Sequence, residues 1–337
     1  MDAQFSIRPA IETDCSEILR LIQELADYEK MPDGPKIGAE VLIGDGFNNA
    51  EAAYYHCLVA ESQDAPGQLV AYCLYFYTYS TDVGRCVYME DLYVSPNFRS
   101  KGLGKSLWQT LVKNALERDC VRCEFVVLDW NQSSIEFYHL QGAKNMSSQE
   151  GWVQLRMNES VMASFKAPKT LSNTKVRRAL KSDGPKIWNL IMEQTGMDGR
   201  LRKPYLNPQA LSRDGIESDD PYFHCLVGEN HENPSIIEGY LLYYYVYSTW
   251  EGRAVCMEDF YVSPKSRNKG IGQSLLEALL KIAVDKKCVR CNFKVHKSNE
   301  ASLTFFSKIG SQNISSDEGW LLYRMDRNAM EEFIKVK

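Results

Sequence analysis

A basic, glycine-containing segment occurs twice in this chain of 337 residues. It reads Arg99-Ser100-Lys101-Gly102-Leu103-Gly104 the first time and Arg267-Asn268-Lys269-Gly270-Ile271-Gly272 the second. Each segment stands between a strand-like and a helix-like stretch. A helix N-terminus offers unpaired backbone N–H groups and a positive dipole end, and glycine lets a ligand approach the backbone closely. With the added arginine and lysine, the segment predicts a pyrophosphate cradle that differs in spacing from P-loop and dinucleotide motifs.

The repetition extends far beyond this segment. His56-Cys57-Leu58-Val59 returns as His224-Cys225-Leu226-Val227, and Glu150-Gly151-Trp152 returns as Glu318-Gly319-Trp320, each time 168 positions later. A constant offset over so long a stretch indicates that a whole domain was duplicated. We predict an N-terminal domain over residues 1–166 (the first copy), a polar linker over 167–174 and a C-terminal domain over 175–337 (the second copy).

One copy predicts a mixed α/β (α+β) fold in which helices pack on a central sheet. Capping and helical spacing after Asp14 predict a first helix, Leu103 to Ala115 predicts a long one, and Asn131 caps a short one. The strands expected from aromatic and β-branched enrichment are Phe5 to Arg8, Tyr55 to Ala60, Leu69 to Thr78, Arg85 to Val94, Cys123 to Leu128 and Val153 to Met157.

Composition and charge narrow the function classes. The net charge of −5 gives no general attraction to nucleic acid or to an anionic membrane, and it mildly favours a cationic substrate. The first residues show no secretory signal, and the apolar stretch Tyr240 to Tyr247 is too short to span a bilayer. Ten cysteines are expected to be reduced thiols in the cytoplasm. The motifs Cys120–Cys123 and Cys288–Cys291 stand far apart in equivalent places, so we expect no metal site.

Residues along nearly the whole first copy resemble the spermidine/spermine (diamine) acetyltransferase family of the GNAT superfamily. The segment at Arg99 is similar to its acetyl-CoA motif Arg/Gln-x-x-Gly-x-Gly/Ala. Met89-Glu90-Asp91 and Asn131 with Phe137-Tyr138 also fall where that family has matching residues. The resemblance implies acetyl-CoA-dependent N-acetylation of a small polyamine-like amine by direct attack. Thialysine or another small amino compound is an alternative substrate, and a non-catalytic CoA-binding or regulatory protein is an alternative function.

The resemblance also implies roles for single residues. Tyr138 would donate a proton to the departing CoA thiolate, unless it is only a core aromatic residue. Glu90 would act as the base through a water molecule, unless it is a strand acid paired with a nearby arginine. Acidic and aromatic residues would hold the amine, unless they form only a solvated charged face: Asp27, Tyr28, Glu29, Asp82, Glu90 and Glu150.

Acetyl-CoA itself would contact one set of residues in each copy. The amide groups from Leu92 onward would polarise the thioester, and Asn131 would contact CoA or serve only as a helix cap. The predicted set in the first copy is Leu92, Tyr93, Val94, Arg99, Ser100, Lys101, Gly102, Leu103, Gly104, Lys105, Asn131 and Tyr138. In the second copy it is Tyr261, Val262, Arg267, Lys269, Gly270, Gly272 and Asn299.

The two copies differ at the residue that matters most for the chemistry. Phe306 stands 168 positions after Tyr138 and has no proton to donate. The second copy also has Trp250, as the family often does, where the first has Asp82. We therefore predict that the second copy is degenerate, although it keeps the features of a CoA site. It would complete the first copy as a covalent pseudo-dimer, with further oligomerisation left open. A fully active, stable monomer of residues 1–166 would contradict this hypothesis.

Overall fold

The computed structural model describes residues 5–31, 33–48, 52–63, 67–147, 151–167, 175–197, 207–230, 232–314 and 319–335. In the first half its elements are β1 (Phe5–Pro9), α1 (Cys15–Tyr28), α2 (Ala39–Gly46), β2 (His56–Ser62), β3 (Leu69–Ser80), β4 (Gly84–Val94), α3 (Leu103–Glu117), β5 (Arg122–Leu128), α4 (Gln132–Leu140), β6 (Lys144–Asn145), β7 (Trp152–Asn158) and α5 (Glu159–Ser164).

The second half repeats this order. Its elements are β8 (Lys175–Arg178), α6 (Gly184–Met197), α7 (Pro208–Leu211), β9 (His224–Glu229), β10 (Ile237–Ser248), β11 (Gly252–Val262), α8 (Ile271–Asp285), β12 (Arg290–His296), α9 (Glu300–Lys308), β13 (Gln312–Asn313), β14 (Trp320–Asp326) and α11 (Arg327–Lys335). Helix α2 was not predicted from the sequence.

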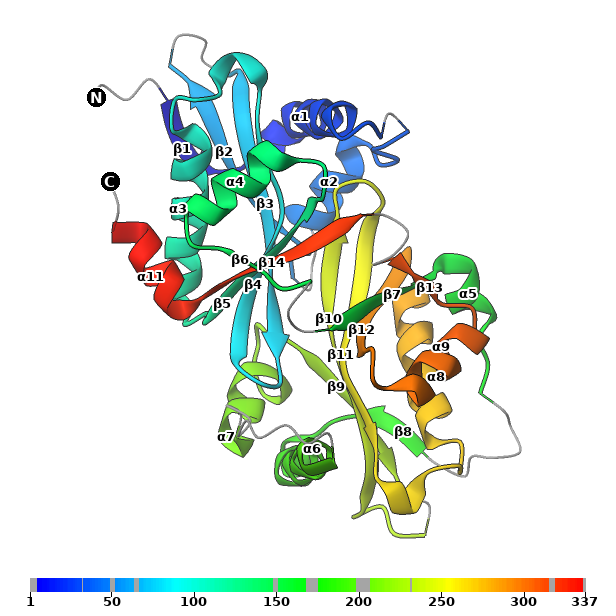
Figure 1. Cartoon of the computed structure of the whole chain (residues 1–337). Helices are drawn as coiled ribbons and strands as arrows, with labels where there is room; N and C mark the ends of the chain where they lie inside the picture. The colour runs from blue at the N-terminus through cyan, green and yellow to red at the C-terminus, as the bar shows by residue number, and fades with distance from the viewer. Residues whose placement is uncertain are drawn as a thin grey trace.

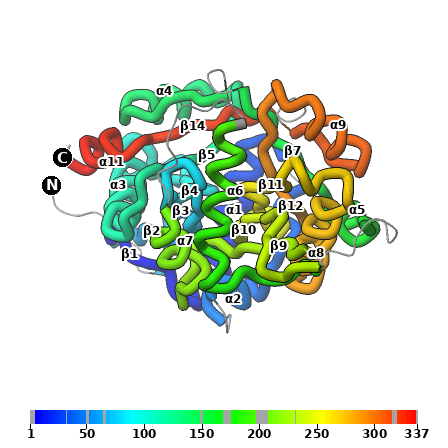
Figure 2. The backbone as a smooth tube through the Cα atoms, turned by 90° about the horizontal axis from the view of Figure 1, so that it is seen from below, coloured from blue at the N-terminus to red at the C-terminus, as the bar shows by residue number. Residues whose placement is uncertain are grey.

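Two mixed sheets form the framework, which confirms the predicted fold class. Their strand orders are β1-β2-β3-β4-β5-β14-β6 and β13-β7-β12-β11-β10-β9-β8. The long helix α3 packs Leu107, Trp108 and Leu111 against the first sheet, and α8 packs its apolar face on the second in the same way. Seen from below in Figure 2, α3 and α8 lie on opposite sides of the molecule with the strands between them.

The last long strand of each half belongs to the sheet of the other half. Strand β7 pairs antiparallel with β12, from Trp152 opposite His296 to Asn158 opposite Arg290. Strand β14 pairs with β5 in the equivalent register, and Figure 1 shows it in red among the strands of the first sheet. The predicted domain boundaries separate the two copies of the sequence repeat. Each folded sheet, in contrast, combines strands from both halves of the chain. Residues 168–174 of the predicted linker lie outside the described residues.

The central hairpin of each half stays in the sheet of its own half, but its end reaches across to the other half. At the end of the β3–β4 hairpin, the ring of Tyr79 lies 4.5 Å from that of Phe223, and Arg85 forms an ion pair with Asp214 at 2.7 Å. The β10–β11 hairpin reciprocates, because Arg253 forms an ion pair with Asp45 at 2.6 Å. Each hairpin therefore ends beside the first two helices of the opposite half.

The exchange of the last strands predicts how the first copy behaves alone. Residues 1–166 lack β14, so the edge of β5 would be left open. We expect the fragment to dimerise, with β7 of one molecule replacing β14 beside β5 of the other, because β7 and β14 pair in equivalent registers. Light scattering after size-exclusion chromatography would measure this, with the full chain as the control. A folded monomeric fragment would contradict the expectation.

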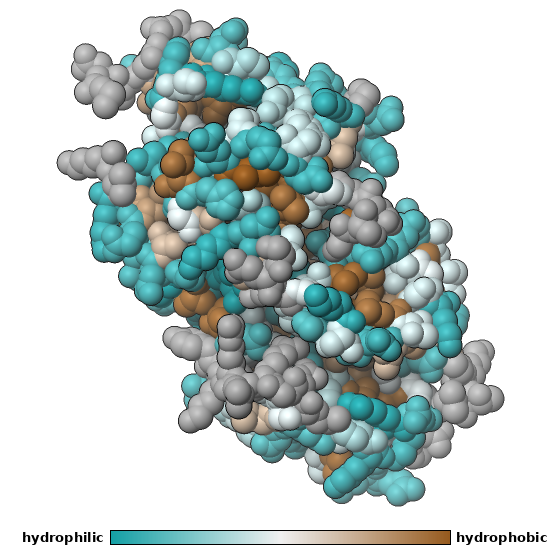
Figure 3. Space-filling model, in the orientation of Figure 1, coloured by the Kyte–Doolittle hydropathy of each residue, from teal (hydrophilic) through white to brown (hydrophobic). Residues whose placement is uncertain are grey.

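The face of the molecule in Figure 3 is mainly hydrophilic, with separate smaller hydrophobic areas. Among the described residues, no helix is both long enough and apolar enough to cross a membrane.

Candidate active site

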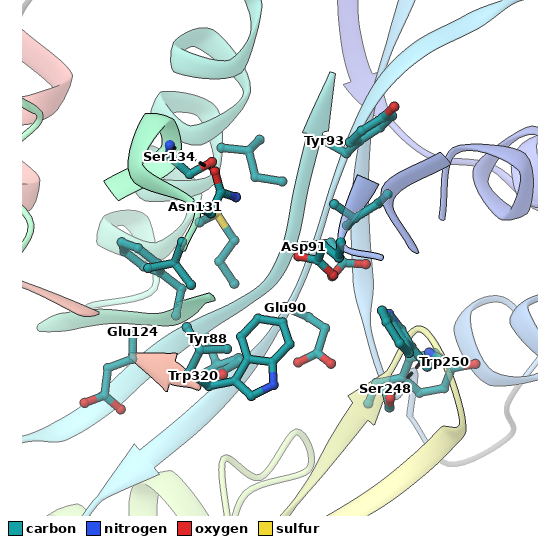
Figure 4. A pocket seen from close by; sticks show the side chains of 18 of the residues that line it. Tyr88, Glu90, Asp91, Tyr93, Glu124, Asn131, Ser134, Ser248, Trp250 and Trp320 are labelled. Carbon is teal, nitrogen blue, oxygen red and sulfur yellow. Dashed lines mark hydrogen bonds between the residues drawn. The ribbon is translucent and has the colours of Figure 1, made fainter. Parts of the chain in front are cut away.

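Strands β4 and β5 form a fork in the middle of the first sheet. They pair in parallel only from Cys86 to Tyr88, and β4 then continues to Val94. A register shift lies just beyond this pairing: Met89 stands opposite Tyr75 and Asp91 opposite Leu74, which leaves Glu90 as an extra residue. Such a bulge redirects side chains. In Figure 4 the carboxylates of Glu90 and Asp91 project from β4 into the open space.

The fork opens into a cavity of about 1130 Å³. The first half contributes the basic loop before α3, the centre of β4, the C-terminal end of α1 and part of α4. The second half contributes Trp250 and Glu251 from the β10–β11 turn, Arg290 from β12 and Trp320 from β14. The cavity therefore joins the predicted phosphate loop to Glu90, and both halves build its wall.

The loop before α3 leaves space for a ligand at the helix N-terminus. Gly102 caps the helix in the left-handed conformation, with φ of 80°, and a Cβ atom added to it would meet no atom within 4 Å. The Arg99 side chain donates a hydrogen bond to the Val94 carbonyl at 2.8 Å and lies over the ring of Tyr28. Lys105 lines the cavity, whereas the ammonium of Lys101 lies over the ring of Phe98. The open N-terminus and this charge fit a pyrophosphate.

Tyr138 is at once a core residue and part of the cavity wall. Its ring lies 4.3 Å from that of Phe125 and 5.1 Å from that of Trp108. Only 8% of the residue is exposed, yet it lines the cavity. Burial raises the pKa of Tyr138, so the phenol keeps its proton at neutral pH. Tight packing and a neutral hydroxyl are what a fixed proton donor requires.

Phe306 occupies the equivalent place in the second half. Its ring lies 4.4 Å from that of Phe293 at an angle of 47°, and the Tyr138–Phe125 pair has 4.3 Å and 46°. The arrangement of the two rings is therefore repeated, although Leu276 stands where Trp108 contacts Tyr138. The hydroxyl group is what the second half lacks at this place.

Three carboxyl groups of the cavity wall, those of Glu29, Glu90 and Asp91, lie close enough for one to raise the pKa of another. Burial, together with the neighbouring charges of Asp91 and Glu90, raises the pKa of Glu29 to about 8. Burial also raises the pKa of the Glu90–Asp91 pair, although Arg290 and Arg156 counteract the effect on Glu90. Such a site attracts a cationic amine, and a carboxyl with a raised pKa is suited to accept a proton near neutrality.

The raised pKa of Glu29 predicts a pH effect on stability. The unfolded chain loses this proton near pH 4.5, whereas the folded chain keeps it up to about pH 8. The folded state therefore binds more protons in this window, and its stability falls as the pH rises. Glu29→Gln should remove about 1–3 kcal/mol of that fall, because one pKa unit corresponds to about 1.4 kcal/mol and the side chain is partly exposed.

Urea unfolding of the wild type and Glu29→Gln at pH 5 and pH 8 would measure the effect. Asp27→Asn is a suitable control, because it removes an exposed acid from the same helix. An equal loss of stability in the wild type and in Glu29→Gln would show that Glu29 does not hold a proton in the folded state.

The remaining predicted substrate residues are placed unequally. The Tyr28 hydroxyl lines the cavity and donates a hydrogen bond to Asn131 at 3.2 Å. Asp27 is exposed and lies outside the cavity wall, where it accepts a hydrogen bond from Gln23. Glu150 lies outside the described residues.

Asp82 requires a correction. It lies in the turn between β3 and β4, which ends beside the second half, and it does not line this cavity. Its counterpart Trp250 does, because the β10–β11 hairpin ends beside the first half. The sequence prediction overlooked that the end of each hairpin reaches across to the other half. It also missed Glu251, Arg290 and Trp320 as parts of the first site. One signal was available in the sequence: the tryptophan that the resembled family often has at this place occurs in the second copy, as Trp250, and not in the first.

The residues predicted to bind CoA keep a common geometry in both halves. Asn131 accepts a hydrogen bond from the Ser134 amide and Asn299 from the Ser302 amide, so both serve as helix caps. Gly270 repeats the φ of 80°, and Arg267 repeats the bond to a strand carbonyl. Contact of these residues with CoA stays a prediction.

The described cysteines are free thiols, and nearly all are buried. Within the described ranges, no group of three or more histidine, cysteine, aspartate or glutamate side chains is arranged to hold a metal ion.

The sequence matches a known protein family in both halves. A family model described as "Acetyltransferase (GNAT) family" matches residues 19–143 and again 185–310. The chain is 44% identical over 161 residues to thialysine N-epsilon-acetyltransferase of Bos taurus, covering 46% of this chain and 94% of that protein. It is 39% identical over 158 residues to human spermidine/spermine N(1)-acetyltransferase-like protein 1, covering 46% of this chain and 22% of that protein.

Two solved structures share the fold over nearly the whole chain. A tandem GNAT protein from the clavulanic acid biosynthesis pathway has a TM-score of 0.52 at 12% identity, covering 96% of this chain and 98% of that one. A GCN5-related N-acetyltransferase from Sphaerobacter thermophilus has a TM-score of 0.52 at 16% identity, covering 97% of each chain. At such identities the likeness concerns the fold alone.

Proposed function

The chain belongs to the acetyltransferase (GNAT) family as a tandem N-acetyltransferase, and from that premise we propose that the cavity beside Tyr138 transfers an acetyl group from acetyl-CoA to a small amine. The observation that carries the proposal is the single cavity that joins the loop before α3, the β4–β5 fork, Glu90 and Tyr138. Such a cavity can hold both reactants side by side.

Each residue then has a chemical task. Acetyl-CoA would supply the acetyl group as a thioester. The Arg99–Lys105 loop would hold the pyrophosphate of its CoA part, and the free edge of β4 would polarise the thioester carbonyl. Glu90 accepts a proton from the substrate ammonium through water, so that the nitrogen lone pair can attack the carbonyl carbon. As the C–S bond breaks, the Tyr138 hydroxyl would donate its proton to the departing sulfur, and the acylated nitrogen would lose its second proton to solvent, from which the Tyr138 hydroxyl is restored. No bond to the enzyme forms.

The second half has a different task in this proposal. It completes the first cavity with Trp250, Arg290 and Trp320, and it keeps the glycine loop that would bind CoA. Without a hydroxyl at Phe306 it does not transfer the acetyl group at a comparable rate. A full chain with two CoA sites should bind two CoA molecules, and isothermal titration calorimetry would count them.

The substrate class is small amines, for two reasons. The three carboxyl groups at the fork favour a cation, and the relatives carry the names thialysine and spermidine/spermine acetyltransferase. The test is release of the CoA thiol by the full chain with acetyl-CoA and thialysine, lysine, spermidine or spermine. Release with at least one amine supports the proposal. CoA binding without release for any of these amines would overturn it.

A further inference from the structure

An ion pair from the second half lies in the wall of the first cavity. Arg290 stands at the start of β12, and Glu251 lies in the β10–β11 turn. The Arg290 Nη1 atom is 3.0 Å from Glu251 Oε2, with the two side chains 14% and 32% exposed. Lys36, which is 67% exposed, also contacts Glu251 at 3.2 Å. Both members of the pair line the cavity, so a cavity ligand can reach a cation and an anion side by side.

Arg290 has hydrogen-bonding capacity left over. Its Nε–H group is buried and has no acceptor in the described part of the chain. The Nε atom is closed off from the cavity, so a ligand would reach Arg290 through the exposed part of its guanidinium group, which belongs to the cavity wall. Arg290 also lies close enough to Glu90 for its charge to lower the pKa of that carboxyl. The cation therefore faces the same space as the proposed base.

The other half of the repeat does not preserve this pair. The counterpart of Arg290 is Arg122, which contacts Glu124 at 3.6 Å. Val83 stands where Glu251 would be, and Asp82 replaces Trp250. The arginine–glutamate pair with its neighbouring tryptophan thus occurs in the cavity that has Tyr138, and the chain does not repeat it for the half that has Phe306. Two independent differences between the copies single out the same site.

We propose that Arg290 and Glu251 recognise the zwitterionic head group of an α-amino acid whose side chain ends in the reacting amine. Arg290 binds the carboxylate through its fork of N–H donors, and Glu251 binds the α-ammonium group. Trp250 covers the apolar stem between the head group and Glu90. A linear polyamine has no carboxylate to offer Arg290. This inference rests on the proposed acetyltransferase function and narrows its substrate class.

Three amines with one carbon stem separate these contacts. L-Lysine has both head groups, 6-aminohexanoate has the carboxylate alone, and 1,5-diaminopentane has no carboxylate. The full chain should show the highest kcat/KM for lysine, mainly through KM. Arg290→Met should lower kcat/KM for lysine and 6-aminohexanoate by about 10- to 100-fold relative to 1,5-diaminopentane, because one charge-assisted hydrogen bond contributes roughly that factor.

Glu251→Gln gives a second and different signature. It should lower kcat/KM for lysine by about tenfold and leave 6-aminohexanoate unchanged or improved, because lysine loses a contact with its α-ammonium group and 6-aminohexanoate has no such group to lose. Arg122→Met, the counterpart in the other half, is the matched control and should keep the wild-type ratios. If Arg290→Met fails to fold, the Glu251→Gln ratios decide alone.

Each outcome has a definite meaning. An equal loss for all three amines in Arg290→Met would assign Arg290 a structural role and overturn the inference. A wild-type chain that acetylates 1,5-diaminopentane as well as lysine would overturn it too, while the acetyltransferase proposal stands. If no amine releases CoA, both fail together.

Discussion

Tyr138→Phe should reduce kcat for thiol release by about 10²-fold or more, since a positioned general acid contributes roughly 10²- to 10⁴-fold. The change removes one oxygen atom and keeps the ring, which packs 4.3 Å from Phe125 and 5.1 Å from Trp108. KM for the amine and the thermal midpoint should therefore stay close to the wild-type values. Burial keeps the Tyr138 proton in place across the accessible pH range, so the loss should not depend on pH.

Tyr323→Phe is the matched control for this experiment. Tyr323 lies in the same aromatic cluster, with its ring 6.5 Å from that of Tyr138, and its hydroxyl contacts His139 at 3.1 Å. The same loss of a hydroxyl there should change kcat by less than about threefold, because no proton transfer is assigned to it. If Tyr138→Phe kept half of the wild-type kcat, Tyr138 would be only a core residue.

The repeat and its motifs were enough to predict most of one copy. The constant offset predicted two related folds, and the glycine loop was placed correctly before a long helix. The family comparison confirms the prediction of a tandem acetyltransferase. Local patterns sufficed here, because capping, helical spacing and strand alternation depend on neighbouring residues.

The exchange of strands could not be predicted in this way. Val153 and Met157 in β7 correspond to Leu321 and Met325 in β14, and both strands pair in equivalent registers. The apolar pattern fits either sheet equally well, so it fixes the register and leaves the choice of sheet open. That choice depends on the packing of the whole molecule.

The composition of the site follows from that choice. Because the last strands are exchanged and the hairpin ends reach across, Trp250, Glu251 and Arg290 line the same cavity as Tyr138 although they stand far from it in sequence. Asp82 was assigned to the first site for its negative charge, whereas the turn that carries it ends beside the second half. In a duplicated chain the substrate residues of one copy are therefore to be sought in the other.

Glu90→Gln should lower kcat/KM by about 10²-fold on the alkaline plateau, the low end of what general base catalysis supplies. Burial raises the pKa of the Glu90–Asp91 pair, and the base form of Glu90 is needed. Wild-type kcat/KM should therefore rise with pH above the range of an ordinary glutamate. In the Glu90→Gln variant, the rise of kcat/KM that comes from deprotonation of Glu90 should disappear. Only the rise that comes from deprotonation of the substrate amine should remain.

Glu258→Gln provides the matched comparison, because it makes the same change at the same bulge of the second sheet. Burial also raises the pKa of Glu258, to about 7, although the charged neighbours differ from those of Glu90. The difference that bears on proton donation is the ring nearby, with a hydroxyl at Tyr138 and none at Phe306. If Glu258→Gln lowered turnover as much as Glu90→Gln, the second half would itself be catalytic, and a base would suffice without the tyrosine. If only Glu90→Gln lowers it, base and acid act together at one site, which the second half completes from outside.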